Sequence, residues 1–263
     1  MTFVKISIVF PYLNLFKIIM CWSSGASTVL ATIGITTTIY SVYKKEPLPL
    51  CFALGYFALM EALQAFTYTV INECDNPANQ IATLLSYLHI AIQPFFANAV
   101  YLYFIDEKVR DKIAYFVYFA CFCCSIIMII QLYPFDWAGS CNPSRPLCGQ
   151  ILCSVFGNWH IAWLVPTNGI GNSLVDGHML FGTHGFIVYD MIVFVIPILY
   201  GSWKMVIYHF LLGSTLAKLT TDNLNEWPAV WCLFSIGLLL IVVKTPIRNL
   251  LYVKKWFWWK LIK

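Results

Sequence analysis

Charged side chains are scarce in this sequence. Only 11% of its 263 residues are Asp, Glu, Lys or Arg, whereas a soluble globular domain carries about 25%. A soluble globule of this size would lack the polar surface that water requires, so the shortage of charge excludes that class. In place of charge, 60% of the residues are hydrophobic and 17% are aromatic. We therefore expect an integral membrane protein, with the lipid bilayer covering most of its surface.

Acidic residues are missing from the C-terminal tail. From Lys244 to the end, the chain has six basic residues and none that is acidic, and four aromatic residues stand together at 256–259. Segment 248–263 is therefore predicted to be an interfacial anchor that attracts anionic lipid headgroups. No nucleic-acid-binding fold accompanies the basic residues, so nucleic acid is not an expected partner.

Apolar runs of membrane-spanning length recur along the chain, and alternating β-barrel patterns are absent. In lipid, a helix satisfies its own backbone hydrogen bonds, so we expect an all-α transmembrane bundle. Residues 1–20 are predicted to form an interfacial segment, with a cleaved signal sequence as the alternative. No repeat or domain boundary divides residues 1–263, which are predicted to form one transmembrane domain. Prolines and charged stretches delimit seven predicted helices, at 22–43, 48–72, 80–105, 113–133, 181–200, 203–219 and 227–247.

The distribution of basic residues predicts the orientation of this bundle. With the N-terminus outside, twelve of the 16 Lys and Arg residues fall in segments that face inside. The positive-inside rule therefore favours an outer N-terminus, an inner C-terminus and an odd number of spans. We predict seven spans, and five would follow if 181–200 and 203–219 formed a re-entrant pair.

A long polar segment, 134–178, would then form an outer loop between the fourth and fifth helices. Four cysteines fall on the outer side: Cys74, Cys141, Cys148 and Cys153. An even number of cysteines on the oxidising side predicts two disulfides, and the sequence leaves their pairing open. A zinc site is the alternative, but these four cysteines show no Cys-x-x-Cys spacing.

β-Prone runs lie within this loop at 150–156 and 159–165, and Gly157-Asn158 separates them. Two such runs around a two-residue Gly-Asn turn are typical of a β-hairpin. A short interfacial helix through 159–165 is the alternative. A hairpin held by disulfides would cap the outer end of the bundle.

Ionisable side chains at bilayer depth are costly, so each one needs a reason. Glu61, His89 and Asp190 come from three predicted helices, and a rise of 1.5 Å per residue puts each roughly 14–17 Å below the outer surface. Gln64 shares a helix face with Glu61, and Gln93 shares one with His89. We predict that these five residues line a polar ligand-binding cavity near the midplane. The alternative is hydrogen bonding between helices without a ligand.

Other polar residues receive structural interpretations. Four further histidines are interpreted as interface or surface residues: His160, His178, His184 and His209. Glu226 and the following Trp227-Pro228 are typical of a helix start, with an acidic residue in the first turn and an early proline. Trp227, Trp231 and Ser235 form a stripe at i, i+4 and i+8, which indicates a packing seam.

Four segments carry a resemblance to a known family: Glu61-Ala62-Leu63-Gln64, Asn76-Pro77-Ala78-Asn79-Gln80, Tyr87-Leu88-His89-Ile90-Ala91-Ile92-Gln93-Pro94 and Asn225-Glu226-Trp227-Pro228-Ala229-Val230-Trp231-Cys232. In these segments the chain resembles a family of multi-span membrane proteins designated as a domain of unknown function. The resemblance covers most of the spanning region. It implies a helical membrane fold and no particular activity.

Motifs of better-known seven-helix families are absent. G-protein-coupled receptors end the third helix with an acidic-Arg-aromatic motif, where this chain reads Ile105-Asp106-Glu107-Lys108. Lys244 lies too close to the inner edge to hold retinal as in microbial rhodopsins. Membrane hydrolases of the ceramidase type have a late His-x-x-x-His pair, which this chain lacks.

Three functions therefore remain. We predict a protein that binds or transports a small or amphipathic ligand, or protons, at the polar cavity and needs no cofactor. The first alternative is a membrane-embedded metal enzyme acting on lipid, with Glu61, His89 and Asp190 as ligands. Metal sites usually contain more than one histidine at defined spacing, which disfavours that alternative. The second alternative is a structural or assembly protein.

Overall fold

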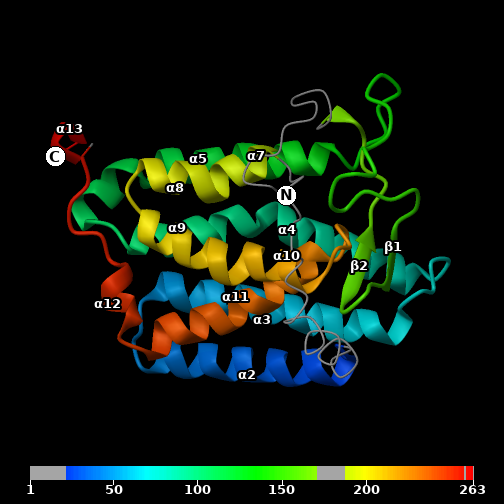
Figure 1. The fold of residues 1–263 in the computed structure, drawn as a ribbon, viewed down its shortest axis with the longest axis horizontal. Coiled ribbons are helices and arrows are strands. Elements are labelled where there is room, and N and C mark those ends of the chain that lie inside the picture. The colour runs from blue at the N-terminus through cyan, green and yellow to red at the C-terminus, as the bar shows by residue number, and fades with distance from the viewer. Residues whose placement is uncertain (1–21, 171–186, 258, 263) are drawn as a thin grey trace, which may run out of the picture.

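The computed structural model describes residues 22–170, 187–257 and 259–262, and these are mainly helical (Figure 1). Consecutive long helices pack side by side and antiparallel because short turns join them. The last long helix packs against the second of them. These helices are α2 (Ser24–Tyr43), α3 (Leu48–Thr67, extended by the 3₁₀ turn Tyr68–Val70), α4 (Pro77–Tyr103), α5 (Glu107–Ile130) and α11 (Trp227–Lys244).

Two further rods of the bundle are irregular, because a π-helical segment interrupts each of them. The first rod comprises α7 (Ile187–Asp190), η2 (Met191–Val195) and α8 (Ile196–Leu199). The second comprises α9 (Trp203–His209), η3 (Phe210–Thr215) and α10 (Leu216–Thr220). Together they match the predicted helices 181–200 and 203–219, except that residues 181–186 lie outside the described part. A π turn is wider than an α turn and is frequent at functional sites.

Side-chain caps define where α4 and α5 begin. The Asn76 side chain accepts the Ala78 N–H at 2.9 Å, and Pro77 occupies the first helical position. Asp106 accepts the Lys108 N–H at 3.1 Å, so α5 begins at Glu107. The prediction that this helix begins at 113 was wrong. The charged stretch forms the first turns of α5 because Asp106 caps it there.

A two-stranded antiparallel hairpin closes one end of the bundle (Figure 1). Strand β1 (Cys153–Phe156) pairs with β2 (Ile161–Leu164), and Phe156 lies opposite Ile161. The predicted hairpin is therefore confirmed, and the alternative helix through 159–165 is wrong. The turn contains residues 157–160 rather than Gly157-Asn158 alone. We call residues 140–168 the hairpin cap and this end of the bundle the hairpin end.

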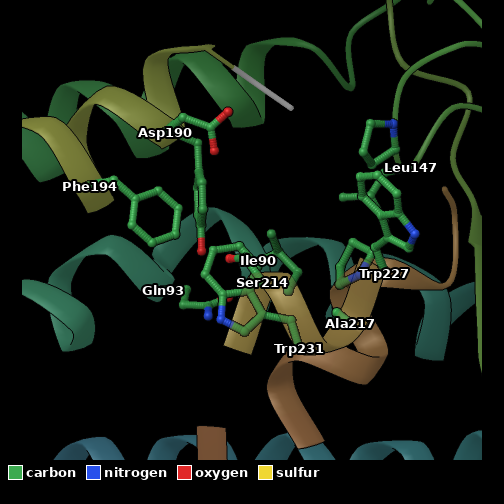
Figure 2. A pocket seen from close by; sticks show the side chains of 12 residues that line it. Ile90, Gln93, Leu147, Asp190, Phe194, Ser214, Ala217, Trp227 and Trp231 are labelled. Carbon is green, nitrogen blue, oxygen red and sulfur yellow. The ribbon is translucent and has the colours of Figure 1, made fainter. Parts of the chain in front are cut away.

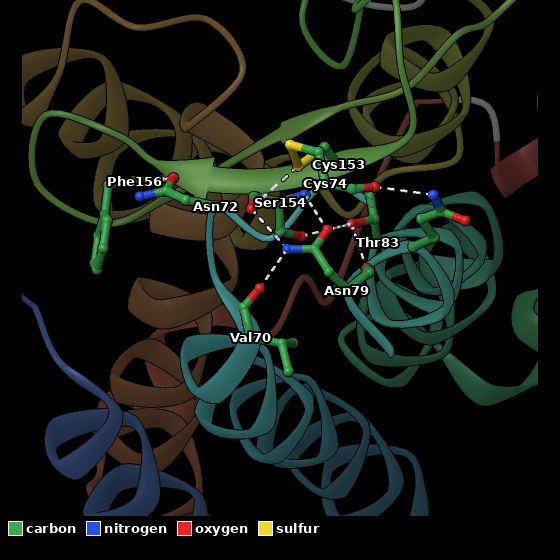
Figure 3. Close-up of a disulfide and its surroundings, with 9 residues drawn as sticks. Val70, Asn72, Cys74, Asn79, Thr83, Cys153, Ser154 and Phe156 are labelled. Carbon is green, nitrogen blue, oxygen red and sulfur yellow. Dashed lines mark hydrogen bonds between the residues drawn. A yellow bond between two sulfur atoms is a disulfide. The ribbon is translucent and has the colours of Figure 1, made fainter. Parts of the chain in front are cut away.

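Both predicted disulfides are present, and all four predicted cysteines take part in them. Cys74 is bonded to Cys153 and Cys141 to Cys148. Beside the first bond, Asn79 of α4 accepts the Ser154 N–H at 2.9 Å and donates to the Ser154 carbonyl at 2.9 Å (Figure 3). The Asn79 side-chain amide thus bonds to the backbone of β1 as a neighbouring strand would. Helix α4 and the Cys74–Cys153 disulfide together hold the cap on the bundle.

The C-terminal tail folds across the opposite end of the bundle (Figure 1). It contains the short helices α12 (Ile247–Leu251) and α13 (Trp259–Ile262). The indole N–H of Trp256 donates to the Leu199 carbonyl at 2.9 Å, and that of Trp259 donates to the Tyr200 carbonyl at 3.0 Å. Part of the predicted aromatic anchor therefore packs within the protein, whereas Phe257 is exposed.

Four helices of the described part are long and apolar enough to cross a membrane: α2, α3 with its 3₁₀ turn, α5 and α11. Large apolar side chains stand exposed on their outer faces, such as Ile39 on α2 and Phe116 on α5, which are 66% and 70% exposed. This pattern is compatible with a membrane protein. The predicted segment 1–20, residues 171–178 of the predicted outer loop, and His178 and His184 lie outside the described residues.

Candidate functional site

A cavity of about 70 Å³ lies between α4, α7–η2, η3–α10 and α11, beneath the hairpin cap (Figure 2). Of the five predicted site residues, Gln93 and Asp190 line it, and Glu61, Gln64 and His89 do not. The cap contributes two residues from the loop that the Cys141–Cys148 disulfide closes. The described lining residues are Ile90, Gln93, Pro146, Leu147, Tyr189, Asp190, Phe194, Ser214, Ala217, Trp227, Pro228 and Trp231.

Polar atoms without partners surround this cavity. Both amide atoms of Gln93, the Tyr189 hydroxyl and the Ser214 hydroxyl are buried and make no hydrogen bond within the described structure. Asp190 also lines the cavity and is 6% exposed. Buried polar groups in proteins are nearly always hydrogen-bonded, so several unbonded groups around one cavity indicate a polar occupant. We call Gln93, Tyr189, Asp190 and Ser214 the cavity group.

The π segments position this group. Asp190 directly precedes η2, and Ser214 lies within η3. Asn98 of α4 supports the first rod, because its side-chain N–H groups donate to the Pro94 and Ile192 carbonyls at 3.0 and 3.1 Å. The Tyr200 hydroxyl in turn donates to the side-chain amide oxygen of Asn98 at 3.0 Å. A buried amide therefore satisfies carbonyls that irregular helices leave without their usual partners.

Aromatic rings form the apolar walls of the cavity. Trp231 stacks on Phe194 with ring centroids 5.5 Å apart and stands nearly perpendicular to Tyr189, at 85°. The Trp231 indole N–H donates to His209 Nε2 at 2.9 Å, and His209 Nδ1 is hydrogen-bonded to the Tyr101 hydroxyl. An indole N–H can only donate, so His209 Nε2 is the acceptor and the imidazole proton lies on Nδ1.

His209 corrects one sequence-based interpretation, whereas Trp231 extends another, because it packs against neighbouring rings and also lines the cavity. His209 was expected to be an interface or surface residue but is buried, and it fixes the orientation of a cavity wall. Trp231 and Trp227 were expected to form a packing seam, and both line the cavity. The spacing i, i+4 correctly placed them on one helix face, but it could not show that this face borders an empty volume.

Glu61 and Gln64 of α3 form a second buried polar group, which we call the α3 group. Both residues are 0% exposed, and none of their side-chain oxygens or nitrogens has a hydrogen-bond partner in the described structure. The Ser27 hydroxyl of α2 lies next to the Glu61 carboxyl group, just outside good hydrogen-bond geometry, and Cys232 of α11 is close enough for electrostatic interaction. Neither Glu61 nor Gln64 lines the cavity.

His89 lies apart from the cavity, between α3 and α4. Its ring stacks on Tyr56 with centroids 3.7 Å apart, and the Tyr56 hydroxyl donates to the His89 backbone carbonyl. Tyr56 stacks on Phe96 on its other side. His89 Nε2 is buried without a hydrogen bond, so it makes no direct bond to Glu61. The expected convergence of Glu61, His89 and Asp190 on one cavity is therefore not found.

These three residues also do not form a metal site. Within residues 22–170, 187–257 and 259–262, no group of three or more His, Cys, Asp or Glu side chains is arranged to hold a metal ion. The reason is geometric, since Asp190 lies at the cavity, Glu61 lies near Ser27 of α2 and Cys232 of α11, and the ring of His89 stacks on Tyr56.

Glu226 attaches the hairpin cap to the bundle. Its carboxylate accepts the N–H groups of Asn158, Trp159 and His160 in the hairpin turn, and also the Thr221 hydroxyl. The predicted helix start is confirmed, since α11 begins at Trp227, directly after Glu226, and Pro228 lies in its first turn. The Glu226 carboxylate also binds the hairpin turn, through charge-assisted hydrogen bonds to three successive N–H groups.

Two neighbours complete this attachment. The Asn225 side chain accepts the Cys148 N–H at 3.1 Å and donates to the Cys148 carbonyl at 3.0 Å. His160 packs inside the cap, where its Nδ1 is hydrogen-bonded to the Tyr68 hydroxyl at 2.8 Å. Burial lowers the pKa of His160 to about 3, so the imidazole is neutral at physiological pH. His160 was expected to be an interface or surface residue, and it is buried inside the cap.

Residues 25–252 match the model of a family described as "Family of unknown function (DUF5765)", and the chain belongs to that family. The resemblance expected from the four quoted segments is thereby confirmed. Two of those segments, 76–80 and 225–232, contain the residues that attach the hairpin cap. Comparisons with curated proteins and with solved structures gave no match.

Proposed function

We propose that this protein crosses a membrane seven times and binds a small ligand in the cavity beneath the hairpin cap. The observation that carries the proposal is the cavity group, in which Gln93, Tyr189 and Ser214 present buried polar atoms without partners to one cavity. Leaving such atoms unpaired costs about 1–3 kcal/mol each, so a hydrogen-bonding occupant would stabilise the site.

Three features support the membrane part of the proposal. Four helices have the length and hydropathy of membrane spans. Helix α4 and the two π-interrupted rods would supply the remaining three crossings. They are more polar because they face the interior: α4 buries Ser86, Gln93 and Asn98. The exposed apolar faces of α2 and α5 would contact lipid.

The two ends of the bundle support an orientation with the hairpin end outside. Both disulfides lie at the hairpin end, and disulfides persist on the oxidising side of a membrane. Most basic residues lie at the opposite end, in the turn after α2, in the first turns of α5 and α9, at the end of α11 and in the C-terminal tail. These two independent signals agree with each other, since cytoplasmic segments carry the excess of Lys and Arg.

Cysteine labelling tests the topology. Every cysteine outside the two disulfides is replaced by serine or alanine, and Asp75→Cys or Asp111→Cys is then added. Both positions are exposed. Asp75 lies just before α4, at the hairpin end, and Asp111 lies near the start of α5, at the opposite end of the bundle. We expect an impermeant thiol reagent applied to intact cells to modify Asp75→Cys and spare Asp111→Cys. Modification of both from outside would refute the seven-span model.

The same background tests the cavity. Ser214→Cys should react with methyl methanethiosulfonate, a small neutral reagent, because its side chain lines the cavity. Adding Ala217→Trp should fill the cavity and slow the reaction by about tenfold or more. Leu219→Trp is the matched control, since Leu219 lies on the same helix and is 71% exposed. An unreactive Ser214→Cys would mean a closed, dry interior and would favour the structural or assembly function.

A further inference from the structure

Two lysines converge on one aromatic ring at the end of the bundle opposite the hairpin cap, where α2 and α11 end (Figure 1). The Lys244 ammonium lies 4.5 Å from the centroid of the Tyr40 ring, and the Lys44 ammonium lies 5.6 Å from the same centroid. The Lys44 ammonium also lies 5.8 Å from the centroid of Tyr43. All four side chains are exposed. We call Tyr40, Tyr43, Lys44 and Lys244 the lysine–tyrosine cluster.

The positive charge of this cluster is not balanced by a carboxylate. In the described part of the chain, neither Lys44 nor Lys244 forms an ion pair. The nearby carboxylate of Glu46 is bonded to the Arg248 guanidinium at 2.6 Å. The C-terminal ends of α2 and α11 each carry a partial charge of about −0.5, which offsets only part of the two positive charges. Because the two ammonium groups repel each other, an anion between them would be bound favourably.

An open apolar groove begins one helical turn from this cluster. It has a volume of about 350 Å³ and lies between α2, α3 and α4. On α2, Ile35 and Ile39 line the groove, and Tyr43 of the cluster follows at the same spacing of four residues, so all three lie on one helix face. On α3, the lining extends from Phe52 to Leu59. The groove and the cluster therefore form one continuous surface.

The polar groups of this groove are bonded within the protein. The Thr38 hydroxyl donates to the Gly34 carbonyl at 2.8 Å, and the Tyr56 hydroxyl donates to the His89 backbone carbonyl. Tyr56 is stacked between His89 and Phe96, with ring centroids 3.7 and 3.8 Å away. The groove thus offers an ordered surface whose hydroxyl groups are already satisfied. Such a surface suits a hydrocarbon chain, which has no polar group to desolvate.

The length of the groove matches one leaflet of a bilayer. Ile35 lies nine residues before Lys44, which corresponds to about 14 Å along a helix axis. Leu59 lies eleven residues after Leu48, the first residue of α3, which corresponds to about 16 Å. Half of the hydrocarbon core of a bilayer is about 15 Å thick. An acyl chain whose headgroup lies at the lysine–tyrosine cluster would therefore fill the groove as far as the midplane.

We propose that the lysine–tyrosine cluster and the groove together bind one anionic phospholipid. Its phosphate lies between Lys44 and Lys244, and one of its acyl chains lies in the groove between α2, α3 and α4. This inference rests on the membrane-spanning arrangement proposed above and does not depend on the cavity beneath the hairpin cap. With the hairpin end outside, the cluster faces the cytoplasmic leaflet, which contains the anionic lipids.

Lipid retention tests the headgroup site. The full-length protein is placed in nanodiscs with equal amounts of phosphatidylglycerol and phosphatidylcholine, and the lipid that it retains is identified by native mass spectrometry. We expect phosphatidylglycerol to be retained over phosphatidylcholine by about tenfold or more. The double variant Lys44→Gln/Lys244→Gln should retain both lipids equally, whereas Lys44→Arg/Lys244→Arg should keep the preference because it keeps the charge. Equal retention of the two lipids by the wild-type protein would overturn the proposal.

Lys254→Gln/Lys255→Gln is the matched control. It removes the same charge from two exposed lysines of the predicted anchor 248–263, at the same end of the bundle. This variant should keep the preference for phosphatidylglycerol. Loss of the preference in the control alone would place the headgroup at the C-terminal tail and overturn the proposed site. Equal losses in the control and in Lys44→Gln/Lys244→Gln would show a general effect of net charge and would also overturn it.

A photoreactive lipid tests the groove. Phosphatidylglycerol with a diazirine on one acyl chain is activated in vesicles that contain the protein, and the labelled residues are identified by peptide mapping. We expect Phe52 and Leu59 of the groove to be labelled more than Phe116, which is 70% exposed on α5. Lys44→Gln/Lys244→Gln should lower the labelling of the groove to the level of Phe116.

Equal labelling of the groove and of Phe116 in the wild-type protein would indicate ordinary contact with lipid and would overturn the acyl-chain site. The cysteine labelling of the two ends of the bundle decides separately whether the membrane-spanning arrangement is correct. A protein that spans the membrane as proposed but shows no lipid preference would therefore contradict this inference alone.

Discussion

Two groups of buried polar side chains occupy the helical bundle, and they differ in the helices that hold them. The cavity group lies between rods that contain π segments, and it borders a cavity of about 70 Å³. The α3 group lies on a regular α-helix that packs against α2 and α11, and it does not line that cavity. Both groups contain buried atoms without hydrogen bonds.

This difference teaches that buried polarity alone does not define a binding site. Regular helices pack at close to crystal density, and neither residue of the α3 group lines the cavity beneath the hairpin cap. A π segment widens one turn and shifts the following residues, which leaves volume next to polar side chains. We therefore interpret the cavity group as the site and the α3 group as a costly feature of the packing.

The largest expected change in stability comes from breaking the attachment of the hairpin cap, which closes the cavity of the first group. Glu226→Ala removes the acceptor of three backbone N–H groups, and we expect the free energy of unfolding to fall by about 3 kcal/mol. Chemical unfolding in detergent measures the change. The loosened cap should also speed labelling of Ser214→Cys, because the cap supplies Pro146 and Leu147 to the cavity.

Two control variants accompany Glu226→Ala. Glu226→Gln keeps one acceptor oxygen and should lose less stability than the alanine variant. Glu107→Ala removes an exposed carboxylate and should change stability by about 0.5 kcal/mol or less. If Glu226→Ala were no more destabilised than Glu107→Ala, the carboxylate would not be what attaches the cap.

The next largest expected effect is a loss of folding stability at acidic pH. The pKa of His160 is about 3 in the folded protein against 6.5 for the ordinary side chain, because burial disfavours the charged form. The unfolded chain therefore binds a proton first, and stability present above pH 6.5 is lost as the pH falls from 6.5 towards 3. By pH 5 we expect a loss of about 2 kcal/mol.

His160→Gln isolates this effect, because an amide can bond to Tyr68 but does not titrate in this range. The variant should lose less stability between pH 7 and pH 5 than the wild-type protein does. Equal losses would show that other groups, and not His160, cause the pH dependence.

A pair of leucine substitutions gives the smallest effect and compares the two groups directly. Glu61→Leu removes buried polar atoms without partners and keeps a similar volume, so the free energy of unfolding should rise by about 1 kcal/mol. Gln93→Leu should change stability little and weaken ligand binding, because its amide faces the cavity. A large loss of stability in Glu61→Leu would mean that Glu61 has an essential partner, which would reverse our interpretation of the two groups.

Much of the fold could be predicted from the sequence because its signals are local. Apolar runs, prolines and charged stretches placed the helices, and the positions of Cys74, Cys141, Cys148 and Cys153 predicted two disulfides. The start of α5 was predicted too late, since a charged stretch is equally typical of a loop and of a capped first helical turn. Asp106 decides between them.

Only part of the site could be predicted, because a cavity depends on contacts between distant segments. Helical spacing correctly marked Gln93 and Asp190 as interior residues but also grouped them with Glu61 and His89 at the same depth. Depth along a helix does not specify the neighbouring helix, and the pattern contains no sign of a π segment. Tyr189 and Ser214 were missed because neither residue carries a charge that would mark it as a candidate. The sequence also gives no sign of the π segments that place them at the cavity.

An experimental density map of the protein in lipid would test the central claim most directly. We predict ordered density in the cavity between α4, η2, η3 and α11, within hydrogen-bonding distance of the Gln93 amide and the Tyr189 hydroxyl. The α3 group should show no comparable density. A map in which the cavity is closed, with Gln93, Tyr189 and Ser214 bonded directly to one another, would contradict the account.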